Sequence, residues 1–208
     1  MKNKFSLIVL AASVAFSGSA LAAGNVWDSA TPWGSSTLAQ FAEWNTFDSA
    51  AFDNTPESGT GSISLSPAGG FLFDTNIYTF NSIPTVTGTL AGTAGVFDVY
   101  LRVASQGNPL VSTATLNGVS ASSILGYTAA ADLGAGTEEE LYWVWKGVTG
   151  GDLYTFQFQA STAHILIDQI ALATVAVTAV PEPSSYAMLA LGLGMLGAAG
   201  RRARKQAK

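Results

Sequence analysis

The chain has 208 residues, of which 48% are hydrophobic and only 11% are charged, a composition that excludes a disordered chain and a coiled coil. It has no cysteine and one histidine, which excludes disulfides, zinc fingers and Cys–His catalysis. Most of its Lys and Arg residues lie at the two ends, and only Arg102 and Lys146 lie between them, against thirteen acidic residues from Asp28 to Asp168. A body with a net charge of −11 cannot neutralise phosphates, so we expect no nucleic-acid partner.

Residues 1–22 have the three parts of a secretory signal peptide. Two lysines lie within the first four residues, an apolar stretch follows over residues 5–16, and small side chains occupy the −3 and −1 positions of a cleavage site at Ala20 and Ala22. We therefore expect export by the Sec route and a mature chain that begins near residue 23. Such a domain has to be stable outside the cytoplasm without disulfides.

Residues 23–180 have the size of one domain and a hydrophobic period of two. Apolar and polar side chains alternate over residues 96–103 and 153–159, and Leu141, Trp143 and Trp145 share one face. Shorter strands are expected elsewhere in the domain, at residues 62–65, 71–73, 76–80, 86–90, 113–116 and 165–172.

The turns between these strands support the same fold. Glycine and asparagine separate the strands, and Asn117-Gly118 suits a two-residue type I′ hairpin turn, because both residues tolerate a positive φ. The pattern predicts an all-β protein, an antiparallel β-sandwich of jelly-roll type. One short helix is expected, over residues 36–44.

Few residues of this domain are candidates for chemistry. His164 has no motif beside it that would supply a nucleophile, and we interpret it as a histidine at the start of a strand. The run Glu138-Glu139-Glu140 is interpreted as a solvated loop. No pair of carboxylates is singled out for glycoside hydrolysis, so we expect no enzymatic activity.

Metal and sugar binding remain open from the residues alone. We expect no catalytic cofactor or metal, but a structural calcium ion is an alternative, because an acidic exported domain offers oxygen ligands; Asp28 and Asp168, from the two ends of the domain, are the candidates. Six aromatic residues crowd the beginning of the domain and are interpreted mainly as core, with stacking on sugar rings as the alternative: Trp27, Trp33, Phe41, Trp44, Phe47 and Phe52.

The C-terminal residues 181–208 form a separate segment. It opens with Pro181-Glu182-Pro183, which favours an extended conformation, and an apolar stretch over residues 185–200 follows. A basic tail, residues 201–208, begins with the cluster Arg201, Arg202, Arg204 and Lys205. An apolar helix followed by a basic cluster indicates a stop-transfer signal, so we expect a single transmembrane helix at residues 185–200 with its basic tail in the cytoplasm.

This order of a Pro-Glu-Pro motif, a short Gly-rich apolar helix and an Arg cluster resembles the PEP-CTERM sorting signal. The resemblance covers residues 181–208. It implies export by a Gram-negative bacterium, transient residence in the inner membrane, and processing by an exosortase-type enzyme. It also implies an association with exopolysaccharide and with biofilm.

The body is similar to the jelly-roll, galactose-binding-like domains found ahead of this sorting signal, through the segments 41–47, 100–107 and 165–172. Fold alone does not transfer function. We therefore expect a noncatalytic protein of the outer surface or extracellular matrix. A carbohydrate-binding module with a specific sugar site is the alternative, and a membrane-anchored periplasmic protein is a third interpretation.

Overall fold

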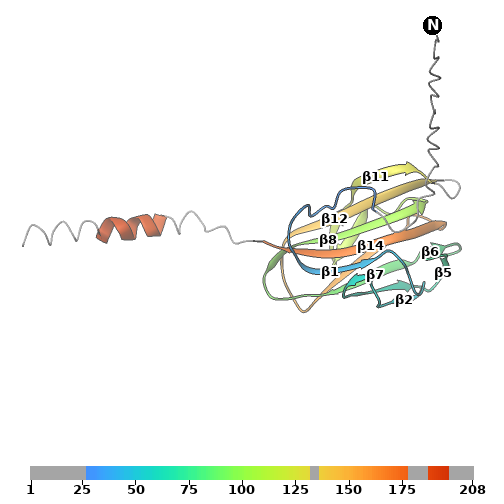
Figure 1. Cartoon of the computed structure of the whole chain (residues 1–208), viewed down its shortest axis with the longest axis horizontal. Helices are drawn as coiled ribbons and strands as arrows, with labels where there is room; N and C mark the ends of the chain where they lie inside the picture. The colour runs from blue at the N-terminus through green and yellow to red at the C-terminus, as the bar shows by residue number, and fades with distance from the viewer. Residues whose placement is uncertain (1–26, 132–135, 178–186, 197–208) are drawn as a thin grey trace, which may run out of the picture.

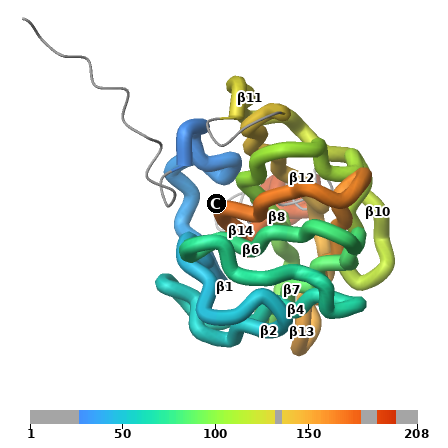
Figure 2. The backbone as a smooth tube through the Cα atoms, turned by 90° about the vertical axis from the view of Figure 1, so that its right-hand side faces the viewer, coloured from blue at the N-terminus to red at the C-terminus, as the bar shows by residue number. Residues whose placement is uncertain are grey.

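Two antiparallel β-sheets face each other across a hydrophobic core (Figure 1). The computed structural model describes residues 27–131, 136–177 and 187–196. The tube in Figure 2, turned by 90°, shows the two layers of the sandwich, with β14 and β8 in one layer and β7 and β4 in the other. The predicted all-β sandwich is therefore confirmed.

The larger sheet has the strand order β11-β12-β8-β14-β1-β3, with β6 paired to the beginning of β14 and β5 paired to β6. Its strands are β1 (Leu38–Trp44), β3 (Ser58–Gly59), β5 (Gly70–Phe73), β6 (Asn76–Thr79), β8 (Val96–Gly107), β11 (Ile124–Ala130), β12 (Thr137–Thr149) and β14 (Ile165–Ala176). The smaller sheet has the order β10-β9-β13-β7-β4-β2. Its strands are β2 (Phe52–Asp53), β4 (Ser62–Ser66), β7 (Thr85–Ala91), β9 (Thr113–Leu116), β10 (Val119–Ser122) and β13 (Leu153–Gln159).

The core is built from the faces that the alternation predicts. On β8, the side chains of Phe97, Val99, Leu101 and Val103 all enter the core. The inward faces of β12 and β13 contribute the predicted aromatic side chains, namely Trp143, Trp145, Tyr154, Phe156 and Phe158. Period-two sequences fold in this way because successive side chains of a strand point to opposite faces of the sheet.

The predicted hairpin turn joins β9 to β10. Asn117 and Gly118 have φ values of 48° and 82°, and they lie between the paired residues Leu116 and Val119. Two consecutive positive φ values are what a type I′ turn requires. This prediction is confirmed.

The helix expected over residues 36–44 is wrong, because this segment contains β1. The strand pairs with β14 from Leu38–Val175 to Trp44–Ile170, and Ala42 and Trp44 are completely buried on its inward face. Burial of the apolar face against the opposite sheet outweighs the weak helix propensity of a short segment.

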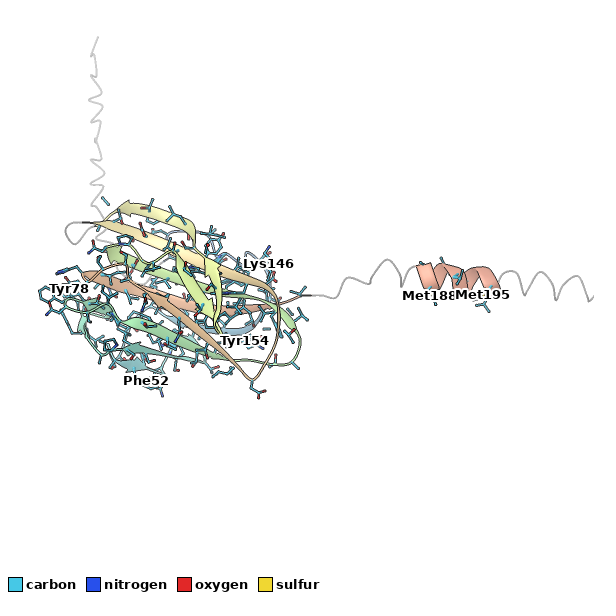
Figure 3. All side chains as sticks on the ribbon, turned by 180° about the vertical axis from the view of Figure 1, so that it is seen from behind. Phe52, Tyr78, Lys146, Tyr154, Met188 and Met195 are labelled. Atoms are coloured by element: carbon cyan, nitrogen blue, oxygen red, sulfur yellow. The ribbon has the colours of Figure 1, made fainter. Side chains whose placement is uncertain are left out.

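Several sequence predictions lie outside the described residues: the signal peptide with Ala20 and Ala22, the Pro181–Pro183 motif, and the basic cluster Arg201, Arg202, Arg204 and Lys205. Of the apolar stretch 185–200, residues 187–196 are described, and they form a helix with exposed side chains that include Met188 and Met195 (Figure 3). Among the described residues, no helix combines the length and the apolar character needed to cross a membrane.

Candidate functional site

Glu140 is the most deeply buried carboxylate of the acidic run, and it belongs to β12. The interpretation of Glu138–Glu140 as a solvated loop is therefore wrong, since all three residues lie in a strand and Glu140 is only 2% exposed. Its Oε2 is 2.9 Å from Nη2 of Arg102 on β8, and both side chains are buried. A charge is stable in such a place only when it is paired and hydrogen-bonded.

The N-terminal strap, which we define as residues 27–37, crosses the outer face of the larger sheet above this ion pair (Figure 1). The backbone N–H groups of Asp28 and Ser29 donate hydrogen bonds to the Glu140 carboxylate. The guanidinium of Arg102 donates to the Ser29 carbonyl at 2.6 Å and lies 4.0 Å from the Trp27 ring centre. Burial lowers the Arg102 pKa, and the Glu140 charge opposes this effect. The carboxylate and the guanidinium therefore hold the strap on the sheet.

Asp28 and Asp168, the candidate calcium ligands predicted from the sequence, lie close enough for the charge of Asp28 to affect Asp168. Asp168 lies at a bulge of β14, between Ile167 and Gln169, and it is buried. Burial raises its pKa above the ordinary value of 3.8, a hydrogen bond from Asn76 lowers it, and the negative charges of Asp28 and Glu140 raise it further. Its Oδ1 has no hydrogen-bond partner among the described residues.

Asp168→Asn is expected to stabilise the protein at neutral pH. Because the folded state raises the Asp168 pKa, the free energy of unfolding of the wild type falls as pH rises from about 3.8 through that raised pKa. The asparagine variant has no carboxylate to ionise there. Its unfolding midpoint, measured by circular dichroism without divalent cations, should exceed that of the wild type at pH 7, and the two midpoints should converge near pH 3.

A matched variant is Asp98→Asn, the same substitution at a half-buried position of β8, where the carboxylate accepts a hydrogen bond from the Gly147 N–H; its midpoint at pH 7 should not exceed that of the wild type. The prediction is contradicted if the midpoint of Asp168→Asn, compared with that of the wild type, is lower at pH 7 than at pH 3.

Within the described ranges, no group of three or more His, Cys, Asp or Glu is placed to hold a metal ion. Repeating the measurement with calcium tests the pair Asp28–Asp168 as ligands, because calcium should then raise the midpoint of the wild type alone.

A second group of side chains, aromatic and polar, lines a cavity of about 540 Å³ at one end of the sandwich. The β5–β6 hairpin, the end of β8 and the beginning of β14 supply most of its wall, and Figure 3 labels Tyr78 at this end. The lining side chains that carry chemistry are Phe73, Tyr78, Gln106, Asn108 and His164. Both the volume and the mixture of aromatic and amide groups are typical of small-ligand sites.

His164 is fixed in an unusual backbone conformation at this cavity. It lies just before β14, at a strand start as predicted, but with a φ of 65°. Its N–H donates to the Thr79 carbonyl at 2.7 Å, its carbonyl accepts from the Asn108 N–H, and its Nδ1 is 2.9 Å from the Tyr78 hydroxyl. Left-handed conformations of residues other than glycine cost energy and concentrate at functional sites.

Three exposed aromatic side chains cluster beside this cavity, whereas only Phe52 is exposed to this degree among the six nominated at the beginning of the domain. Phe71, Phe73 and Phe80 are each about half exposed, and all three rings contact Tyr78. Of the six aromatic residues nominated from the sequence, Trp44 and Phe47 are buried in the core, Trp33 packs edge-on against Phe41 and Tyr100, and Phe52 is exposed on β2.

Sequence reasoning missed Gln106 and Asn108 as site residues. The alternation of Phe71, Phe73, Tyr78 and Phe80 with smaller residues identifies two strands but does not say that their aromatic faces stay uncovered. Only the pairing of β6 with the first residues of β14 brings the hairpin next to His164 and the end of β8.

Comparison with known proteins identifies the C-terminal segment. Residues 179–205 match the family model of the PEP-CTERM protein-sorting motif, which confirms the resemblance carried by the Pro-Glu-Pro motif, the apolar stretch and the basic cluster. No curated protein and no solved structure matches the chain.

Proposed function

Because the chain carries a PEP-CTERM sorting motif at residues 179–205, a motif of exported proteins that exosortase-type enzymes process, we propose that it delivers a noncatalytic β-sandwich to the cell surface or extracellular matrix. There the body associates with exopolysaccharide. The sorting motif is the observation that carries this proposal. The clustering of positive charge at the two ends of the sequence supports it, because both clusters act as signals at the membrane.

The buried Arg102–Glu140 ion pair supports a noncatalytic role for Glu140. Glu140 is held by Arg102 and by backbone donors of the strap, so this carboxylate serves structure. General acid–base work requires a group that can reach a substrate and exchange its proton.

Processing follows from the order of elements in the motif. The basic cluster Arg201–Lys205 stays on the cytoplasmic side, since moving an arginine through a bilayer costs several kcal/mol. The segment Pro181–Pro183 is then held outside the membrane. Each of its two prolines fixes φ and disfavours helix at the preceding residue, and a sequence of this kind favours binding by a processing enzyme.

We expect exported protein to lack residues of the apolar stretch and the basic tail and to end near Val180–Ser184. Replacing Pro181-Glu182-Pro183 by alanines, or deleting residues 201–208, is expected to reduce release of the protein at least tenfold while the β-sandwich still folds. C-terminal mass spectrometry of cell-free and membrane fractions, from a Gram-negative host with an exosortase, measures the end of the exported chain and the amount released.

Gln206→Ala is the matched control, because Gln206 lies in the tail just beyond the matched residues; it should be released like the wild type. Full recovery of peptides that contain Met195 from the cell-free fraction contradicts processing. Accumulation of wild-type chain with an intact tail in the inner membrane identifies a membrane-anchored periplasmic protein instead.

A carbohydrate-binding module is the second candidate function of the body. The observation that favours it is the cavity beside the β5–β6 hairpin, where aromatic rings and amide groups share one wall. Sugars have apolar C–H faces and polar hydroxyl edges, so both kinds of group are needed to bind them.

A further inference from the structure

We propose that the cavity between the β5–β6 hairpin, the end of β8 and the start of β14 binds a neutral hexose unit of a polysaccharide. The proposal deepens the second candidate function above and rests on it, because it gives the carbohydrate-binding activity a site and a substrate class. The site consists of an aromatic wall, a set of hydrogen-bonding groups, and a rigid backbone frame.

The aromatic wall is formed by the β5–β6 hairpin. Phe73 and Tyr78 line the cavity, and Phe71 and Phe80 extend the aromatic surface around Tyr78, with ring centres 5.3 and 6.4 Å from its own. Half-exposed phenylalanines on an outer strand cost solvation energy unless they meet a partner. The electron-rich ring faces attract the polarised C–H groups of a pyranose.

The hydrogen-bonding groups come from the end of β8 and from His164, just before β14, and they share the cavity wall with the aromatic rings. Gln106 is more than nine-tenths buried, and its Oε1 has no hydrogen-bond partner in the part of the chain that the structure describes. Asn108 uses its Nδ2 to donate to the Ala163 carbonyl at 2.6 Å, which leaves the side-chain oxygen as an acceptor. The ring of His164 contacts the Tyr78 hydroxyl through Nδ1, which leaves Nε2 as the ring nitrogen that can bond to a ligand hydroxyl. Sugar hydroxyls both donate and accept, and they satisfy such groups.

The frame that holds these groups is rigid. A Cβ on Gly107, which has a φ of 100°, would lie 2.5 Å from the His164 carbonyl oxygen, so this position requires glycine. The close approach of Gly107 to His164 lets the N–H of Asn108 reach that carbonyl and fixes the imidazole next to Gln106 and Asn108 in the cavity wall. A site preorganised in this way loses little conformational entropy on binding.

Charge decides between neutral and acidic sugars. No Lys, Arg, Asp or Glu is among the described residues that line the cavity, so among them a uronic acid would find no permanent positive charge. The surrounding body is strongly acidic and repels anionic polysaccharides at long range. A neutral hexose avoids both costs.

The test is isothermal titration calorimetry on the full chain in mild detergent, with neutral gluco-, galacto- and manno-hexaoses and with hexagalacturonate as the acidic probe. At least one neutral hexaose is expected to bind, and the acidic one more weakly. Phe73→Ala is expected to weaken that binding at least tenfold. Phe52→Ala is the matched control, because Phe52 is equally exposed but lies on β2 of the other sheet (Figure 3), and it should bind like the wild type.

Gln106→Leu separates a binding role from a structural one. Replacing a buried amide whose Oε1 has no hydrogen-bond partner among the described residues by an apolar side chain of similar size should keep or raise the unfolding midpoint, while binding weakens. Absence of binding to all three neutral hexaoses, tighter binding of hexagalacturonate, or equal affinities of the Phe73 and Phe52 variants would overturn the proposal.

Sorting is measured separately, by mass spectrometry of the released protein and of its C-terminal end in the same variants. A cavity that binds no sugar can therefore be distinguished from a sorting signal that fails.

Discussion

Glu140→Ala is expected to lower the free energy of unfolding by about 3–5 kcal/mol. The substitution leaves the buried Arg102 guanidinium without its counter-ion, and it removes the acceptor for the backbone N–H groups of Asp28 and Ser29. The strap then loses its main attachment to the larger sheet. Equilibrium denaturation with urea measures the loss as a lower midpoint.

The neighbouring Glu139→Ala is the matched control, since its carboxylate accepts a hydrogen bond from Thr137 at the exposed beginning of β12; a loss below about 1 kcal/mol is expected. The double variant Arg102→Met, Glu140→Met should recover most of the stability, because replacing a buried ion pair by apolar side chains is often neutral. If Glu140→Ala and Glu139→Ala cost the same, the ion pair does not hold the strap.

Leu101→Ala is expected to cost about 2–5 kcal/mol of unfolding free energy, a large part of the stability of an ordinary domain. Leu101 is completely buried, and its strand β8 lies between β12 and β14, where it pairs with Trp143 and Leu172. The strands on both sides prevent the backbone from collapsing into the space that a smaller side chain leaves.

Leu153→Ala is the same substitution at a half-exposed position on β13, and its cost should stay below about 1 kcal/mol. Chemical denaturation of both variants gives the comparison. Similar losses at the two positions would show that the inward face of β8 is assigned incorrectly.

The two-sheet fold could be predicted because hydrophobic alternation is a local property. It identified β8, β13 and the centre of β12 with their inward faces, and glycine and asparagine marked the turn between β9 and β10. Hydrophobic alternation did not predict the segments whose structure or burial depends on tertiary contacts. β1 has an unclear period, yet it is held by pairing with β14 over its whole length. Glu140 looks like a surface residue in sequence, yet Arg102 and the strap cover it.

The cavity could not be predicted for the same reason. His164, Gln106 and the β5–β6 hairpin lie far apart in sequence, and the bulge at Asp168 together with the pairing of β6 and β14 brings them together. The sorting motif is the opposite case. Its residues are consecutive and act through composition and order, so sequence alone identifies it.

The place of β14 determines how the body responds to mechanical pulling. β14 is the last strand before the sorting motif, and it is hydrogen-bonded to β8 on one side and to β6 and then β1 on the other. Tension applied at the C-terminal end is directed along this strand, perpendicular to its ladder hydrogen bonds. Many bonds then carry the force together and do not open one at a time. A protein held at that end in flowing water would therefore resist unfolding by drag better than one whose tether leaves from a two-residue edge strand such as β3.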